Sequence, residues 1–213
     1  MAAVFGWGHK VRNDKRLFLH RLALALADGR LDAVIASGGC TSRQQHPGVS
    51  EAAVIYGYLN LEMQEMGCWL APQTRTGEGF SPADLAYIAA YEEFSRAGYR
   101  HKEYGALREV DFFIEPCART SRENICFVRE LLEELDLWEG TELVAWCGAT
   151  HRIKIQALAR FVWGYLPRAV TYAGPRKLWL KQLLLTPPSV LALWSPTLRG
   201  WEDARRERQM DKQ

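Results

Sequence analysis

Residues 110–132 place the strongest constraint on the fold, because they predict a buried strand, a polar turn and an amphipathic helix in direct succession. The apolar run at 110–114 is typical of a buried strand, and Glu115 stands at its end. Thr120 and Glu123 have the spacing of a capping box, in which a hydroxyl and a carboxylate each satisfy a free backbone N–H of the first helical turn. In the helix that follows, Ile125, Val128, Leu131 and Leu132 recur at helical spacing, which predicts one buried face. Such a unit brings the polar residues of its turn to the carboxyl edge of a parallel sheet.

The rest of the chain alternates between predicted strands and helices, which favours an α/β fold with right-handed crossovers. Further strands are predicted at 2–5, 32–36, 142–146 and 168–172. We expect a Rossmann-like three-layer sandwich with a mostly parallel five-stranded sheet, in a single domain of residues 1–196. Residues 67–108 are an inserted loop and helix in this scheme, either a lid over the site or a solvated connection. Residues 197–213 form a charged C-terminal tail, and we expect residues 201–213 of it to be frayed.

Composition narrows the class of protein. With 213 residues, of which 48% are hydrophobic, the chain has enough apolar surface for a folded core. A formal net charge of +2 gives no indication of nucleic-acid binding. Five cysteines without a Cys-x-x-Cys pair indicate free thiols in a reducing cytoplasm. No signal peptide is visible, and the apolar stretch at 178–194 is too interrupted to span a membrane, so we expect it to pack on the core or on a second subunit.

The loop after the second predicted strand is a candidate anion site. Gly38 and Gly39 allow the backbone to turn sharply and to direct N–H groups outward, a geometry that cradles anions. The side chains of Ser37, Thr41 and Arg43 suit a phosphate or a carboxylate. A flexible polar loop without a ligand is the alternative interpretation.

A third polar turn follows the strand at 142–146 and contains Thr150, His151 and Lys154. His151 is a candidate for proton transfer, because the ordinary pKa of histidine lies near neutrality. Because the loops after parallel strands share one edge, we expect His151, Glu115 and Glu51 to meet there as catalytic groups. Glu51 is otherwise explained by its favourable position at a helix start. The expected ligand-binding residues are Ser37, Gly38, Gly39, Thr41, Arg43, Arg119, Thr120, Ser121, Arg122, Glu123, Asn124, Thr150 and Lys154.

These motifs, in this order and spacing, resemble the YdcF/SanA/ElyC-like family, a bacterial domain of unknown function. The matching segments are Ser37-Gly38-Gly39 with residues 50–52, Glu115 with residues 119–124, and Thr150-His151. The resemblance implies a Rossmann-like fold with these residues around a cleft. One member of the family looks like an S-adenosylmethionine binder, so the resemblance also implies this compound as a candidate ligand. This chain departs from the family in its 67–108 segment, in Lys154 and in the absence of an N-terminal membrane segment, which argues against a role in the cell envelope.

Two functions follow as hypotheses. The first is an enzyme, a transferase or hydrolase, that acts on a phosphorylated or carboxylated small molecule, with His151 and a carboxylate as acid and base. The alternative is a nucleotide or S-adenosylmethionine binding protein, either methyltransferase-like or a sensor. Zinc is a weaker hypothesis, because Cys40, Cys117, Cys147 and His151 match no zinc spacing, so we expect no metal site. Cys40 and Cys117 are also candidate nucleophiles, since a helix start lowers a thiol pKa.

Overall fold

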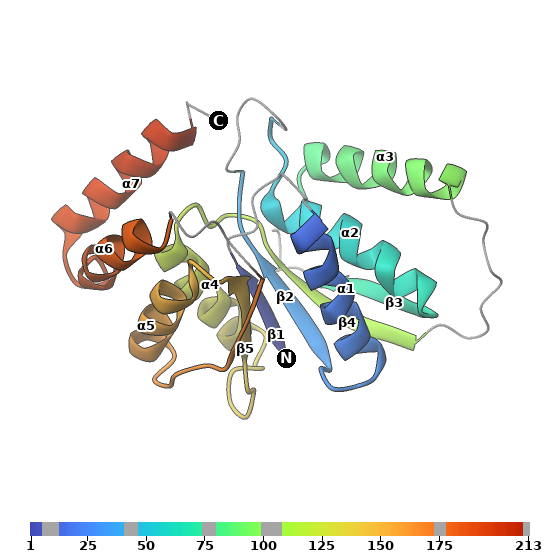
Figure 1. Ribbon diagram of the computed structural model, residues 1–213, viewed down its shortest axis with the longest axis horizontal. Coiled ribbons are helices and arrows are strands. Elements are labelled where there is room, and N and C mark those ends of the chain that lie inside the picture. The colour runs from blue at the N-terminus through green and yellow to red at the C-terminus, as the bar shows by residue number, and fades with distance from the viewer. Residues whose placement is uncertain (6–12, 41–46, 74–79, 99–107, 173–177, 211–213) are drawn as a thin grey trace.

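The computed structural model describes residues 1–5, 13–40, 47–73, 80–98, 108–172 and 178–210. Strands and helices alternate along the chain up to β6, and two helices complete it (Figure 1). The elements are β1 (Ala2–Phe5), α1 (Asn13–Ala27), β2 (Ala33–Ser37), α2 (Glu51–Glu65), β3 (Cys68–Gln73), α3 (Pro82–Gly98), β4 (Arg108–Glu115), α4 (Ser121–Glu134), β5 (Val144–Gly148), α5 (Arg152–Val162), β6 (Ala169–Tyr172), α6 (Leu178–Leu191) and α7 (Pro196–Met210).

The strands form one all-parallel sheet in the order β3-β4-β2-β1-β5-β6, which confirms the α/β Rossmann-like prediction. The expected number of five strands is wrong, because residues 68–73 form a sixth strand at the edge beside β4. This strand contains Pro72, which cannot donate a ladder hydrogen bond and therefore weakens a sequence-based strand assignment. At an edge position, one side of the strand needs no partner, so the proline is tolerated.

Two apolar cores lie on opposite faces of the sheet. One core joins the sheet to α1, α2 and α3, and the other joins it to α4 and α5, with α6 packed outside α5. The predicted inner face of α4 is confirmed, since Ile125, Val128, Leu131 and Leu132 are fully buried. On the opposite face of the sheet, α2 buries Ala52, Ile55, Leu59 and Met63 in the same way. Each large side chain of this kind contributes about 1.5–3 kcal/mol relative to an exposed one.

The 67–108 segment, expected to be an insertion, is part of the central fold. It supplies β3 to the sheet, and α3 packs against α2. Residues 74–79 and 99–107 lie outside the described residues, so the idea of a lid stays a prediction.

The C-terminal region also differs from expectation. α6 continues through Pro187 and Pro188 to Leu191, although each proline removes an N–H donor from the helix. The expected frayed tail is wrong, because residues 196–210 form α7, which lies beside α6 (Figure 1) and is hydrogen-bonded to α4 through Arg122 and Glu202. Among the helices that the structure describes, none is both long enough and apolar enough to cross a membrane.

Candidate functional site

The sheet order predicts a ligand-binding crevice at the carboxyl ends of its central strands. β2 and β4 are neighbours, but α2 covers one face of the sheet and α4 the other. β1 and β5 are also neighbours, and the helices that follow them, α1 and α5, likewise cover opposite faces of the sheet. In open parallel sheets, ligands bind where neighbouring strands are followed by helices on opposite faces. The loops after β2, β4 and β5 all meet at this edge.

Ser37 and Glu115 connect the ends of β2 and β4 directly. The two residues are register partners, and Ser37 Oγ donates to Glu115 Oε2 over 2.7 Å, with Asn124 Oδ1 at 3.0 Å from the same hydroxyl. Glu115 Oε1 also accepts from the N–H groups of Cys117 and Ala118, at 2.9 and 3.1 Å. A buried carboxylate with this many donors is stabilised in its charged form and holds the turn after β4 in place. Glu115 therefore has a structural role, because it connects the end of β2 to the turn that follows β4.

The two glycines after β2 use their N–H groups within the chain. Gly38 N donates to Glu115 O over 2.9 Å, and Gly39 N donates to Ala118 O over 2.6 Å. Gly39 is required by this close approach, because a Cβ there would lie 2.7 Å from Pro116 O. The expected cradle of outward N–H groups at Gly38 and Gly39 is therefore wrong: backbone carbonyls of the next loop already occupy these donors. Thr41 and Arg43, the other expected anion contacts of this loop, lie outside the described residues.

The first N–H groups of α2 are also hydrogen-bonded within the chain. Ser50 Oγ accepts from Ala53 N over 3.1 Å, as expected for a cap, and the N–H groups of Glu51 and Ala52 donate to Gly39 O and Gly38 O. The Glu51 side chain is 6% exposed and lies beside Gly38, where a Cβ would be 3.1 Å from Glu51 Oε2. Glu51 thus points back toward the end of β2 and is buried in the crevice.

The predicted capping box at the start of α4 is confirmed. Thr120 Oγ1 accepts from Glu123 N over 3.1 Å, and Glu123 Oε2 accepts from the N–H groups of Thr120 and Arg119 at 3.1 and 2.7 Å. Ser121 is the first residue of the helix, and Asn124 reaches Ser37 as described above. Thr120, Glu123 and Asn124 therefore have contacts that explain them without a ligand.

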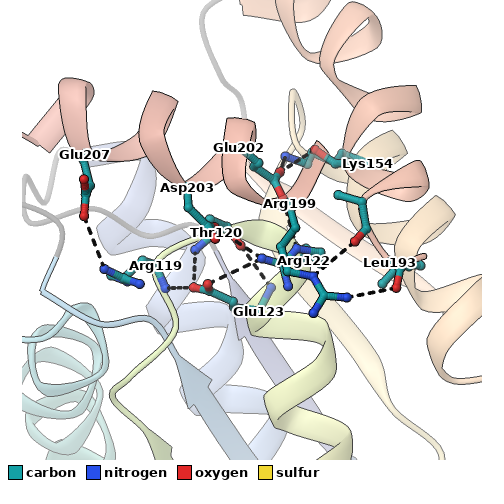
Figure 2. A network of polar contacts seen from close by, with 12 residues as sticks. Arg119, Thr120, Arg122, Glu123, Lys154, Leu193, Arg199, Glu202, Asp203 and Glu207 are labelled. Carbon is teal, nitrogen blue, oxygen red and sulfur yellow. Dashed lines mark hydrogen bonds and ion pairs between the residues drawn. The ribbon is translucent and has the colours of Figure 1, made fainter. Parts of the chain in front are cut away.

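The cations expected to bind an anion lie against acidic residues of α7 (Figure 2). Arg122 Nε donates to Glu202 Oε2 over 3.2 Å, and Arg122 Nη2 donates to Asp203 Oδ1 over 3.3 Å. Arg119 Nη1 lies 3.9 Å from Glu207 Oε1 at the exposed end of the same helix. The sequence predicted these cations at the crevice but missed α7, because a highly charged segment with little apolar character resembles a solvated tail.

Glu202 is the centre of this network and is 2% exposed. It accepts from Lys154 Nζ at 3.2 Å and from Ser189 Oγ at 2.6 Å, in addition to Arg122. Burial raises the pKa of Glu202, but the charge of Lys154, the hydrogen bonds from Ser189 and Lys154, and the charge of Arg122 outweigh it and hold the pKa below its usual range. Glu202 is therefore charged at neutral pH and joins α7 to α4, α5 and α6.

His151 precedes α5 directly, after the buried Thr150, and its side chain makes no cap hydrogen bond to the helix. Burial and, to a smaller extent, the charge of Lys154 lower the pKa of His151 to about 4, although the charge of Glu51 opposes both. The imidazole is therefore neutral at pH 7 and able to accept a proton. Glu51, at the start of α2, is therefore close enough to His151 for its charge to act on the imidazole.

Arg206, on α7, is a site residue that the sequence did not reveal. Burial lowers its pKa, while the nearby charges of Glu51 and Glu123 raise it, and its own charge in turn lowers the pKa of His151. Arg206 Nε is buried and has no hydrogen-bond partner among the described residues. Arg206 is far along the chain from every loop predicted to form the site. Only the position of α7 in the structure therefore identifies Arg206 as a site residue.

The cysteines at this edge have the properties of ordinary thiols. Burial raises the pKa of Cys40, with a further contribution from the charge of Asp84, and burial raises the pKa of Cys147 to about 12. The raised pKa argues against Cys40 as a nucleophile, whereas a nucleophilic Cys117 stays a prediction. In the part of the chain that the structure describes, no three His, Cys, Asp or Glu side chains are grouped as metal ligands.

Comparison with known proteins adds no relative, since no family model, no curated protein and no solved structure matches the chain.

Proposed function

We propose that the protein is an enzyme that acts on a small molecule carrying a phosphate or a carboxylate, bound in the crevice between α7 and the carboxyl edge of the sheet. In this proposal His151 accepts a proton from the substrate, Glu51 stabilises the imidazolium that forms, and Arg206 binds the anionic group. Three distant parts of the chain contribute these residues: the start of α2, the start of α5 and α7.

The observation that carries the proposal is the environment of Arg206. A buried N–H donor without a partner costs about 1–3 kcal/mol, and an anionic oxygen at Arg206 Nε would remove that cost. The same oxygen would lie near His151, whose neutral form is available as a base. An arginine in a fixed position binds phosphate and carboxylate oxygens well because its donors form a planar fork.

Glu51 is the better candidate for the acidic partner of His151. Its charge acts on both His151 and Arg206, whereas Glu115 is occupied by two backbone N–H groups and by Ser37. We therefore assign Glu115 to positioning and Glu51 to the reaction. Arg122 and Lys154, which are paired with Glu202, hold α7 over the crevice in this account.

The test begins with a thermal-shift screen against phosphomonoesters, mono- and dicarboxylates, ATP, S-adenosylmethionine and S-adenosylhomocysteine. The compound that stabilises the protein most is then used for calorimetry and for turnover, followed by NMR of the reaction mixture. Arg206→Gln is expected to weaken binding at least tenfold, while Arg208→Gln, an exposed residue of the same helix, serves as the matched control. His151→Gln is expected to bind the compound and to lose turnover. Wild-type binding and turnover in both Arg206→Gln and His151→Gln would contradict the proposal.

The same screen tests the alternative, a nucleotide or S-adenosylmethionine binding protein of the YdcF type. Binding of S-adenosylmethionine or ATP without turnover would favour that alternative over the enzyme. We also propose a cytoplasmic location, because five cysteines without a Cys-x-x-Cys pair suit a reducing compartment.

A further inference from the structure

The outer face of α6 is apolar and exposed. Residues at positions i, i+3, i+4, i+7 and i+11 lie on one side of a helix, and here they are Leu180, Leu183, Leu184, Pro187 and Leu191. The four leucines are 49–68% exposed. The opposite face is buried, with Thr186 and Ser189 turned toward the protein. α6 is therefore a packed helix with a second apolar face that nothing within the described chain covers.

Two aromatic side chains extend this apolar face beyond α6. Trp194, just after the helix, is 64% exposed, and Phe161 of α5 is 56% exposed. Their rings are in edge-to-face contact with centroids 5.3 Å apart. Together with the four leucines they present on the order of 650 Å² of apolar surface, more than the largest patch on most monomers. Stable interfaces bury about 600–1,000 Å² on each partner, so this area reaches the lower end of what a stable dimer needs.

The chemistry of the face favours another protein surface over a lipid surface. Helices that lie on membranes carry a charged polar face toward water, whereas the second face of α6 is buried against the protein and none of its described side chains is charged. In addition, Pro187 and Pro188 provide no N–H for the carbonyls of Leu183 and Leu184. Such carbonyls are costly in hydrocarbon, while protein interfaces retain bridging waters that satisfy them.

We infer that this face, made of Leu180, Leu183, Leu184, Leu191, Trp194 and Phe161, is the interface of a homodimer. A twofold axis through α6 places the same apolar face on both copies, which is the self-complementary arrangement of most homodimers. The crevice at the carboxyl edge of the sheet lies on different residues, so dimer formation and the proposed reaction are independent.

Sedimentation velocity of the full chain over a range from about 1 to 100 µM tests this inference. The wild type is expected to sediment as a dimer with a dissociation constant of roughly 10 µM or below. Leu184→Glu places a charge at the centre of the face and is expected to weaken the dimer at least tenfold. Leu85→Glu on α3, another exposed leucine at 56%, is the matched control and is expected to leave the dimer intact. Both positions are exposed, so circular dichroism is expected to show the same folded chain for each.

Three results would overturn the inference. One is a wild type that remains monomeric throughout this range. Another is a dimer that Leu184→Glu leaves unchanged or that Leu85→Glu disrupts equally. The third is a monomer that co-sediments with vesicles of equal phosphatidylcholine and phosphatidylglycerol through Leu184, which would assign the face to a lipid surface.

Discussion

Lys154 Nζ on α5 donates to Glu202 Oε1 on α7 over 3.2 Å, and both side chains are almost fully buried. This pair, extended by Arg122, joins the last helix to the two helices that follow β4 and β5. These charged contacts connect α7 to the rest of the protein and so help to set the position of Arg206.

Glu202→Gln is expected to lower the free energy of unfolding by about 3–5 kcal/mol, because it leaves the charges of Lys154 and Arg122 buried without a full counter-charge. Urea unfolding followed by fluorescence measures this change. Glu207→Gln is the control: its contact with Arg119 is 3.9 Å long and exposed, so the expected change is below about 0.5 kcal/mol. Equal losses in the two variants would contradict the assigned role of Glu202.

Gly39→Ala is expected to lower the free energy of unfolding by about 1–3 kcal/mol, since the added methyl group would lie 2.7 Å from Pro116 O. Gly200→Ala provides the opposite case within α7, where a Cβ meets nothing within 4 Å. That change is expected to stabilise the protein by about 0.5–1 kcal/mol, as alanine is the better helix former. Thermal unfolding of both variants gives the comparison, and a neutral Gly39→Ala would show that the two loops are not in contact.

Glu115→Gln is expected to affect mainly stability, whereas Glu51→Gln is expected to affect mainly turnover. Glu115→Gln weakens the charge-assisted bonds from Ser37, Cys117 and Ala118, with an expected loss of about 1.5–3 kcal/mol in stability. Glu51→Gln is expected to lose turnover on the compound found by the screen while the protein stays folded, even though the change removes a negative charge near Arg206. Unfolding curves and specific activity, measured on the same preparations, separate the roles. The assignment fails if Glu115→Gln abolishes turnover without any loss of stability.

Local sequence patterns predicted most of the fold correctly. The capping box and the buried face of α4 depend only on residues within one turn or one helix, so spacing alone identifies them. The parallel arrangement followed from alternation of strands and helices. β3 was missed because its edge position, which tolerates Pro72, is a property of the whole sheet.

The site was harder to predict than the fold. Sequence order placed His151, Glu115 and Glu51 at one edge, and in the structure the charge of Glu51 affects the pKa of His151. The donors of Gly38 and Gly39 were assigned to a ligand, but they bind carbonyls of a loop that is 77 or more residues away along the chain. Arg206 could not be identified, since its role depends on where a charged terminal helix docks.

The pKa of His151 also predicts how stability varies with pH. The unfolded chain binds a proton at His151 near pH 6.5, whereas the folded chain does so near pH 4. Between these values the unfolded state holds more protons, so the contribution is complete above pH 6.5 and is lost as the pH falls toward 4, by up to about 3 kcal/mol. His151→Gln is expected to remove this part of the wild-type curve. Parallel curves for wild type and variant between pH 4 and 6.5 would contradict the buried position of the imidazole.

The most direct test of the convergence of Glu51, His151 and Arg206 is an NMR titration of the His151 ring, assigned by comparison with His151→Gln. The account predicts a pKa of about 4 in the wild type, a still lower value in Glu51→Gln because a negative charge is removed, and a higher value in Arg206→Gln because a positive charge is removed. A ring that titrates near pH 6.5, and that neither substitution shifts, would contradict the account.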